Sequence, residues 1–141
     1  MSIWKVPVTA EILNANKNDD MVKHLGIEFT EVGEDFIAGK MPVDHRTRQP
    51  FGILHGGAHV VLAETLGSVG ANLVLEPGKG HAVGLDINSN HIKSIREGYV
   101  YGVAKPIHIG GKTQIWEIKI SDENNNLLNI SRLTMFVVKH N

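Results

Sequence analysis

Glu64 is the only acidic side chain in the run from Ala58 to Leu75 (AHVVLAETLGSVGANLVL), which is apolar or small at almost every position. The run predicts one helix with apolar side chains pointing in all directions, as in a buried helix. An unpaired buried carboxylate costs several kcal/mol, so it either becomes neutral or lines a cleft that uses it. Ser68 lies one turn further along the same face. Glu64 and Ser68 are therefore candidate catalytic residues; the alternative is a polar stripe with Thr65 that faces water, or a single structural hydrogen bond.

The residues His55, Gly56 and Gly57 stand where this helix begins. Backbone N–H groups at a helix start have no helical partners, and the helix dipole there favours negative charge. Glycine allows a ligand to approach such a backbone closely. The segment can therefore bind a carbonyl oxygen and stabilise the oxyanion that develops from it.

The spacing of these two features predicts an oligomer. Glu64 follows Gly56 by eight residues, which is roughly 12 Å along a helix axis at a rise of about 1.5 Å per residue. One acyl carbon cannot contact both groups of the same chain. If both act on one carbonyl, the carboxylate comes from a second, antiparallel copy of the helix, so we expect a two-fold homodimer with shared active sites.

Composition excludes several classes of function. The chain has no cysteine, which excludes disulfides, thiolate zinc sites and a cysteine nucleophile. Fourteen basic residues against fifteen acidic ones, without a basic tract, exclude a typical nucleic-acid-binding surface. Carboxylate, histidine and hydroxyl chemistry remain.

Targeting signals and membrane spans are not expected. The N-terminus MSIWKVPVTAEIL lacks the pattern of a signal peptide, and Glu64, Gly67 and Gly70 interrupt the apolar helix. We expect a cytoplasmic protein with no membrane partner.

A metal site is not expected either. His55 and His59 are related by i, i+4, but the intervening acid of a metalloprotease helix and a third ligand are missing. His45 and His81 have no metal-like spacing to them.

The chain reads as one domain, residues 1–141, of class α+β. Two short helices headed by Thr9 and by Asp19 or Asp20 come first, followed by a hairpin of IEFTEV and FIAGKM with Ile27 and Phe29 on one face. The long helix comes next, and then four strands. Alternation is clearest in AVGLDINSNHI (Val83, Leu85, Ile87) and QIWEIKIS (Trp116, Ile118, Ile120). Hairpin-like connectors at Arg96-Glu97-Gly98, Gly110-Gly111 and DENNN predict an antiparallel sheet that curls around the central helix.

The sequence QPFGILHGGAHVVLAETLGS, with NSNHIKSIREG and SRLT further on, resembles the hotdog-fold acyl-CoA thioesterases. The similarity is to the PaaI-like branch that hydrolyses 4-hydroxybenzoyl-CoA and 1,4-dihydroxy-2-naphthoyl-CoA, and especially to the thioesterases of menaquinone biosynthesis. It implies a hotdog fold, a dimer with a continuous sheet and a dimer of dimers. No cofactor is implied, because coenzyme A is part of the substrate.

The resemblance also implies roles for individual residues. Gln49 and His55 would orient the thioester carbonyl, and the Gly56 amide would supply the oxyanion donor. Glu64 of the neighbouring chain would attack the thioester or activate a water held by Ser68. Both routes remain open.

Coenzyme A brings phosphates, which basic and glycine-rich groups bind. The candidates are His91, Lys93, Gly110, Gly111, Lys112 and Arg132. The sequence departs from the family at Lys93-Ser94 and Gly110-Gly111, where relatives tend to carry Arg-Pro and Gly-Arg.

Two other functions compete with the thioesterase. A hotdog dehydratase of hydroxyacyl thioesters also pairs a histidine with a helical acid, but the chain lacks the His-Phe-Pro loop of that family. In a non-catalytic acyl-CoA-binding protein, a lone acid within an apolar helix would be an unnecessary liability.

Overall fold

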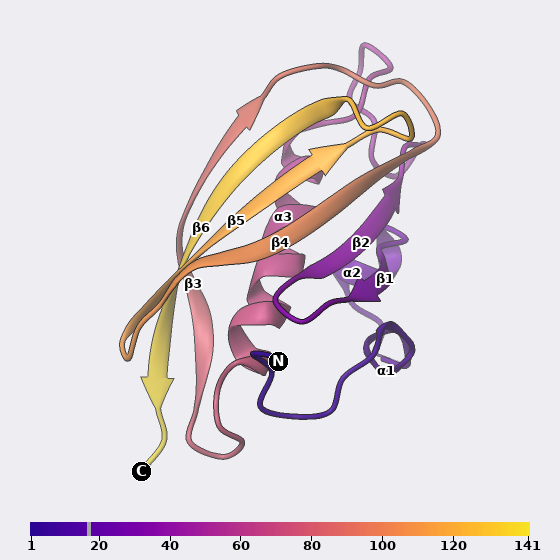
Figure 1. The fold of residues 1–141 in the computed structure, drawn as a ribbon. Coiled ribbons are helices and arrows are strands. Elements are labelled where there is room, and N and C mark those ends of the chain that lie inside the picture. The colour runs from indigo at the N-terminus through magenta and orange to yellow at the C-terminus, as the bar shows by residue number, and fades with distance from the viewer. Residues whose placement is uncertain (17) are drawn as a thin grey trace.

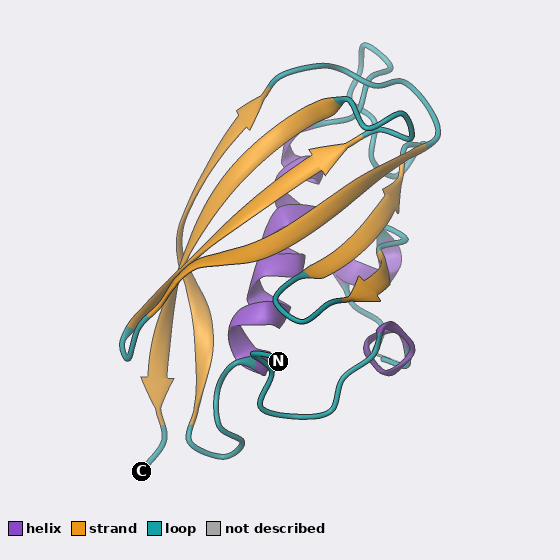
Figure 2. Cartoon of the chain, viewed as in Figure 1, coloured by secondary structure: helices purple, strands orange, loops and turns teal. Residues whose placement is uncertain are grey.

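The computed structural model describes residues 1–16 and 18–141, which form a twisted antiparallel sheet around one long helix (Figures 1 and 2). The predicted α+β class and the order of two strands, one helix and four strands are confirmed. In chain order the elements are α1 (Ala10–Asn14), α2 (Met21–His24), β1 (Glu28–Val32), β2 (Ile37–Pro42), α3 (Gly56–Leu73), β3 (Gly80–His91), β4 (Tyr99–Ile109), β5 (Thr113–Ser121) and β6 (Leu127–Lys139).

The strands are ordered β1-β2-β4-β5-β6-β3, with every neighbouring pair antiparallel. Hairpins join β1 to β2, β4 to β5 and β5 to β6, as their turn residues predict. The hairpin predicted at Arg96-Glu97-Gly98 is wrong, because β4 pairs with β2 and β5 while β3 pairs with β6 at the edge. Residues 92–98 instead cross the end of the sheet, where Leu54 N–H donates to the Ile95 carbonyl at 2.8 Å.

The two short helices begin where their capping residues predict. The Thr9 side chain accepts a hydrogen bond from Ile12 N–H, and the Asp20 side chain accepts one from Lys23 N–H. Side-chain oxygens at these positions satisfy backbone donors that have no helical partner.

Helix α3 begins at Gly56, two residues before the predicted start. His55 is its N-cap, so both glycines of the HGG segment belong to the first turn. The face toward the sheet is fully buried and includes Leu62 and Leu66 at 0% exposure. Val60, Val61 and Val69 on the other side are only half-buried. In a single chain, the predicted burial on all sides therefore holds for one face only.

Two glycines let α3 approach the sheet closely. A Cβ at Gly67 would stand 2.6 Å from Leu133 Cδ2, and a Cβ at Gly70 would stand 2.7 Å from Trp116 Cζ3. Glycine inside a helix costs roughly 1 kcal/mol relative to alanine. Here that cost is offset by contact between the helix backbone and the large side chains of β5 and β6.

Strand β5 provides the centre of the core. Trp116, Ile118 and Ile120 are each 0% exposed, which confirms the alternation predicted for this strand. The Trp116 ring N–H donates to Gln114 Oε1 at 2.8 Å, and the Gln114 amide donates to the Ala71 carbonyl of α3 at 3.1 Å. The buried polar groups are thus paired, as burial requires.

An asparagine occupies part of each sheet edge. At β1, Asn14 donates to the Phe29 carbonyl at 2.7 Å and accepts from Phe29 N–H at 2.8 Å. At β3, Asn72 donates to the Ala82 carbonyl at 3.2 Å and accepts from Ala82 N–H at 2.9 Å. Because β1 is short and bulged at Phe29, its edge is well protected, whereas β3 continues as far as His91.

Candidate active site

The start of α3 presents an unoccupied backbone donor. His55 caps the helix by accepting a hydrogen bond from Gly57 N–H at its Nδ1, at 2.8 Å. In the described part of the chain, the Gly56 N–H has no hydrogen-bond acceptor. This amide is therefore free to bind an oxygen at the positive end of the helix dipole.

A pocket of about 310 Å³ lies beside this helix start. It brings together four predicted site residues, Gln49, Gly56, His91 and Lys93. The other lining residues are Ile53, Leu54, His59, Ile92, Ser94 and Ile95. Polar groups that converge within a mostly apolar lining are typical of small-molecule sites.

The loop before α3 orients Gln49. Its side-chain Oε1 accepts a hydrogen bond from Phe51 N–H, and its carbonyl accepts from Gly52 N–H at 2.9 Å. Gly52 has a φ of +86°, which glycine adopts without the strain of a side chain. Since Oε1 is held by the turn, the side-chain NH₂ group remains as a donor.

Glu64 lies further along α3 and is half-buried. Its carboxylate rests against Gly84 of β3, where a Cβ would overlap Oε2. Within residues 1–16 and 18–141 the carboxylate has no hydrogen-bond or ion-pair partner. Ser68 lies one turn on, and its hydroxyl donates to Met135 Sδ at 3.7 Å rather than to Glu64.

His59 lines the pocket but was given no role from the sequence. It is 4% exposed, and its Nδ1 has no hydrogen-bond partner in the described residues. Burial, followed by the neighbouring His91, lowers the pKa of His59 to about 4. The ring is therefore neutral near pH 7 and stands 5.7 Å from the His91 ring, centroid to centroid.

Asn129 is a second residue near the pocket that the sequence did not indicate as functional. It is fully buried and contacts His91, with 3.0 Å between its Nδ2 and His91 Nδ1. Polar residues that alternate with apolar ones in LLNISRL could have indicated a polar site inside the sheet. Their proximity to His91 depends on the pairing of β3 with β6, which the sequence did not indicate.

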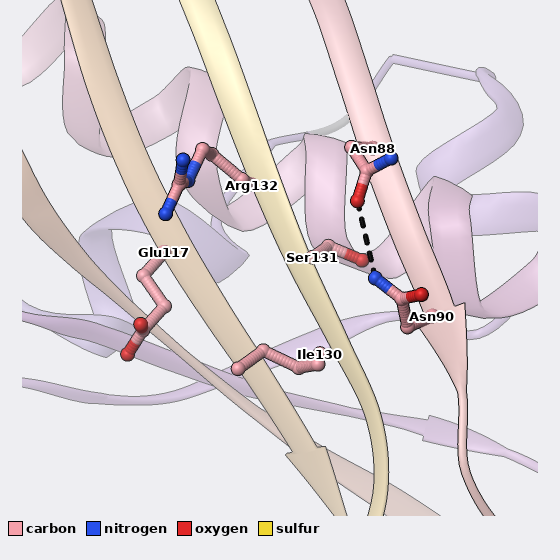
Figure 3. A pocket seen from close by; sticks show the side chains of 6 residues that line it. All are labelled: Asn88, Asn90, Glu117, Ile130, Ser131 and Arg132. Carbon is pink, nitrogen blue, oxygen red and sulfur yellow. Dashed lines mark hydrogen bonds between the residues drawn. The ribbon is translucent and has the colours of Figure 1, made fainter.

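The remaining predicted coenzyme A residues lie elsewhere in the single chain. Gly110 and Gly111 form the β4–β5 turn and line a pocket of about 470 Å³ beyond the C-terminal end of α3, and Lys112 follows them. Arg132 lies on the outer sheet face, in a pocket of about 310 Å³ that Glu117 and Asn88 share (Figure 3). The structure thus places the candidates in three separate regions.

Neither a metal cluster nor a membrane helix is found in the described part of the chain. No three histidine, aspartate or glutamate side chains among residues 1–16 and 18–141 are arranged to hold a metal ion. No helix there is long and apolar enough to cross a bilayer.

Comparisons with known proteins identify the family. Residues 51–129 match the family described as the thioesterase superfamily. The chain is 52% identical to the 1,4-dihydroxy-2-naphthoyl-CoA hydrolase of Escherichia coli, over 96% of this chain and 99% of that protein. It is 46% identical to the proofreading thioesterase EntH of Cronobacter turicensis, over 96% and 98%. A crystal structure of a Haemophilus influenzae thioesterase is 50% identical and superimposes with a TM-score of 0.93, over 97% of this chain and 95% of that one.

The family match covers the helix start, the long helix and strands β3 to β5, and the relatives match 96% or more of the chain. They confirm the predicted hotdog architecture and the predicted class of enzyme, a thioester hydrolase. The chain belongs to the thioesterase superfamily.

Proposed function

We propose that this protein hydrolyses the thioester of an aromatic acyl-CoA, of the 1,4-dihydroxy-2-naphthoyl or hydroxybenzoyl type, to the free acid and coenzyme A. The observation that carries the proposal is the Gly56 amide in a pocket with Gln49 and His91, together with the Glu64 carboxylate on the same helix; neither group has a hydrogen-bond partner among the described residues. The name of the Escherichia coli relative supports the acyl group and a place in menaquinone biosynthesis.

In this reaction the thioester carbonyl oxygen accepts hydrogen bonds from the Gly56 amide and the Gln49 NH₂ group. As the carbonyl carbon is attacked, negative charge develops on that oxygen, where the helix start stabilises it most. The carbon–sulfur bond breaks, and the coenzyme A thiolate leaves and takes up a proton. Glu64 is either the nucleophile, forming a mixed anhydride that water then hydrolyses to the free acid and the Glu64 carboxylate, or the base that removes a proton from the attacking water. In both routes the water supplies the oxygen of the free acid and, overall, the proton that the thiolate takes up. Rapid quenching that traps an acyl group on Glu64 would identify the nucleophilic route.

In the proposed homodimer, the Gly56 amide of one chain and the Glu64 carboxylate of the other act on the same carbonyl. Within one chain Gly56 and Glu64 are roughly 12 Å apart along the helix axis. The edge strand β3 is the proposed contact with the second chain. At its bulge the apolar side chain of Leu85 is 63% exposed, and that of Val83 is 43% exposed. Pairing β3 with β3 of a second copy would extend the sheet, lay the two α3 helices side by side and cover their half-buried valines.

The same two-fold arrangement explains why the coenzyme A candidates are dispersed. Antiparallel helices bring the C-terminal end of one α3 near the start of the other. Gly110, Gly111 and Lys112 of one chain would then meet the phosphates of a coenzyme A whose thioester lies beside His91 and Lys93 of the partner. Arg132 lies instead on the outer sheet face, where exposed Val103 and Phe136 support contact between two dimers.

A mixed-chain experiment tests the shared site. Two impaired variants, Glu64→Ala and the more mildly affected Gln49→Ala, are co-expressed with different affinity tags, and the heterodimer is isolated. In a shared site, the heterodimer combines an intact helix start from one chain with an intact Glu64 from the other, so activity returns. If each site were formed within one chain, the heterodimer would be no more active than its parents.

A substrate panel tests the acyl group and the reaction class. Dihydroxynaphthoyl-, hydroxybenzoyl- and medium-chain acyl-CoA are compared by kcat/KM with a thiol reagent. We expect the aromatic thioesters to be preferred. Dehydration of a hydroxyacyl-CoA without thiol release would indicate a dehydratase, and binding without turnover of any thioester would indicate a carrier or regulatory protein.

A further inference from the structure

Four polar side chains form a connected network between β3 and β6, beneath the pocket. In the register of these strands Ser89 stands opposite Ser131, and His91 stands opposite Asn129. Asn129 is 0% exposed and Ser131 is 2% exposed. Polar groups this deeply buried are costly unless their hydrogen bonds are satisfied, so the arrangement of donors and acceptors is tightly constrained.

The Asn129 amide uses all its donors. Its Oδ1 accepts from the Ser131 hydroxyl at 2.9 Å. Its Nδ2 donates to Ser89 Oγ at 2.9 Å and lies 3.0 Å from His91 Nδ1. Since an NH₂ group can only donate, His91 Nδ1 is the acceptor of that bond. This bond would leave the single proton of a neutral His91 imidazole on Nε2.

The Nε2 atom of His91 lies beside the helix start. A Cβ at Gly56 would stand 2.7 Å from it. Both residues line the same pocket, and the Gly56 amide has no hydrogen-bond acceptor within residues 1–16 and 18–141. A His91 Nε2–H group would therefore add a further donor near that amide, besides the Gln49 NH₂ group.

We propose that Asn129 is a positioning residue that holds His91 as an Nε2–H donor toward the thioester bound at the start of α3. The kinetic part of this inference rests on the proposed function. The part that concerns the proton on His91 does not, because it can be measured without substrate.

The His91 tautomer is measured directly by long-range ¹H–¹⁵N correlation spectra of the imidazole rings in the unmodified protein near neutral pH. The expected spectrum shows His91 with a protonated Nε2 and an unprotonated Nδ1. A protonated Nδ1 would overturn the proposal and would leave the thioesterase assignment untouched.

The variant Asn129→Asp replaces the donor NH₂ with an acceptor oxygen of almost the same shape. When this carboxylate is ionised it accepts a proton-bearing His91 Nδ1, and the preference for the neutral Nε2–H form is lost. For an acyl-CoA that the unmodified protein hydrolyses, kcat/KM of the Asn129→Asp variant should be at least about tenfold lower, in the range expected for weakening one oxyanion donor. The matched control is Asn124→Asp in the exposed β5–β6 turn, which should keep the activity of the unmodified protein.

The variant Asn129→Ser serves if a buried carboxylate prevents folding. It shortens the side chain, so the bond to His91 is lost without a new charge, and the His91 resonances should show both tautomers together with a fall in kcat/KM. A folded variant at position 129 that keeps kcat/KM within about twofold of the unmodified protein would refute the positioning role. A protein with the expected tautomer that hydrolyses no thioester would refute the proposed function and not the hydrogen bond.

Discussion

The backbone of Gly84 lies against the carboxylate of Glu64, so closely that a Cβ on Gly84 would overlap Oε2. Gly84 also precedes the bulge of β3, where the edge strand changes register against β6. A glycine at this position therefore keeps open the space in which the proposed catalytic acid stands.

The variant Gly84→Ala should displace the Glu64 carboxylate and lower kcat about tenfold with little change in KM, because a small misplacement of a reacting group has a large kinetic effect. The φ of Gly84 is not positive, so alanine is compatible with the backbone there. The measurement is steady-state kinetics, with the double variant Gly84→Ala/Glu64→Ala as the control. Additive losses in the double variant would show that the methyl group acts elsewhere.

The variant Glu64→Ala should lower kcat by at least about a hundredfold while the fold and the oligomeric state persist. Its melting temperature should stay the same or rise, because the carboxylate is half-buried in an apolar helix without a partner among the described residues. The exposed Glu31→Ala on β1 is the matched control. Turnover close to that of the control would remove Glu64 from the mechanism.

His59 should make stability depend on pH in a defined window. Its pKa is about 4 in the folded chain against 6.5 for an ordinary histidine, so between these values the unfolded chain binds a proton that the folded chain does not. The free energy of unfolding therefore falls as the pH falls through this window, by roughly 3 kcal/mol in total, and is constant above it as far as His59 is concerned.

Urea unfolding of the unmodified protein and of His59→Leu, at several pH values, checks this expectation. The difference between the two should grow as the pH falls below about 6.5, in favour of the variant. Parallel profiles for the protein and His59→Leu would contradict a depressed pKa.

A charge on the β3 edge should separate the subunits. Leu85→Arg places a cation on the exposed edge strand, and we expect a monomer by sedimentation and a loss in kcat of about a hundredfold, since Glu64 no longer reaches the second chain. Val103→Arg, on the outer sheet face, should reduce a tetramer to an active dimer. An active monomer of Leu85→Arg would refute the shared site.

The phosphate contacts can be separated from the chemistry with a truncated substrate. Lys112→Ala should raise KM for the acyl-CoA about fivefold, the effect of losing one charge-assisted contact. It should have no effect on the corresponding N-acetylcysteamine thioester, which lacks the nucleotide. Arg132→Ala is the comparison, because this residue lies on the other sheet face, and its KM for acyl-CoA should change less.

Local patterns predicted most of the fold, and contacts between distant segments account for what was missed. The alternation around Trp116 and the turn at Gly110-Gly111 define β5 and its hairpin within a few residues of sequence. The partner of β3 is β6, at the far end of the chain, whereas the short connector after β3 predicted a hairpin with β4.

The residues of the candidate site also fall into those that are close in sequence, which could be predicted, and those brought together by distant segments, which could not. Gln49 and Gly56 are near each other in sequence, and the loop and the helix start bring them into one pocket. Asn129 contacts His91 only because β3 and β6 are neighbours, so its role was invisible before the fold was known. The position of Glu64 relative to a carbonyl depends on a second chain, which neither a sequence pattern nor the fold of one chain specifies.

The two edge asparagines have a consequence for aggregation. Asn14 closes one margin of the sheet, and Asn72 leaves most of the opposite margin able to accept another strand. A sheet that can grow from one side only is finished after a single copy has been added, because that copy presents its own closed side outward. Pairing through β3 would thus satisfy the exposed edge strand of both molecules. No unpaired edge would then remain to extend the sheet into fibrils.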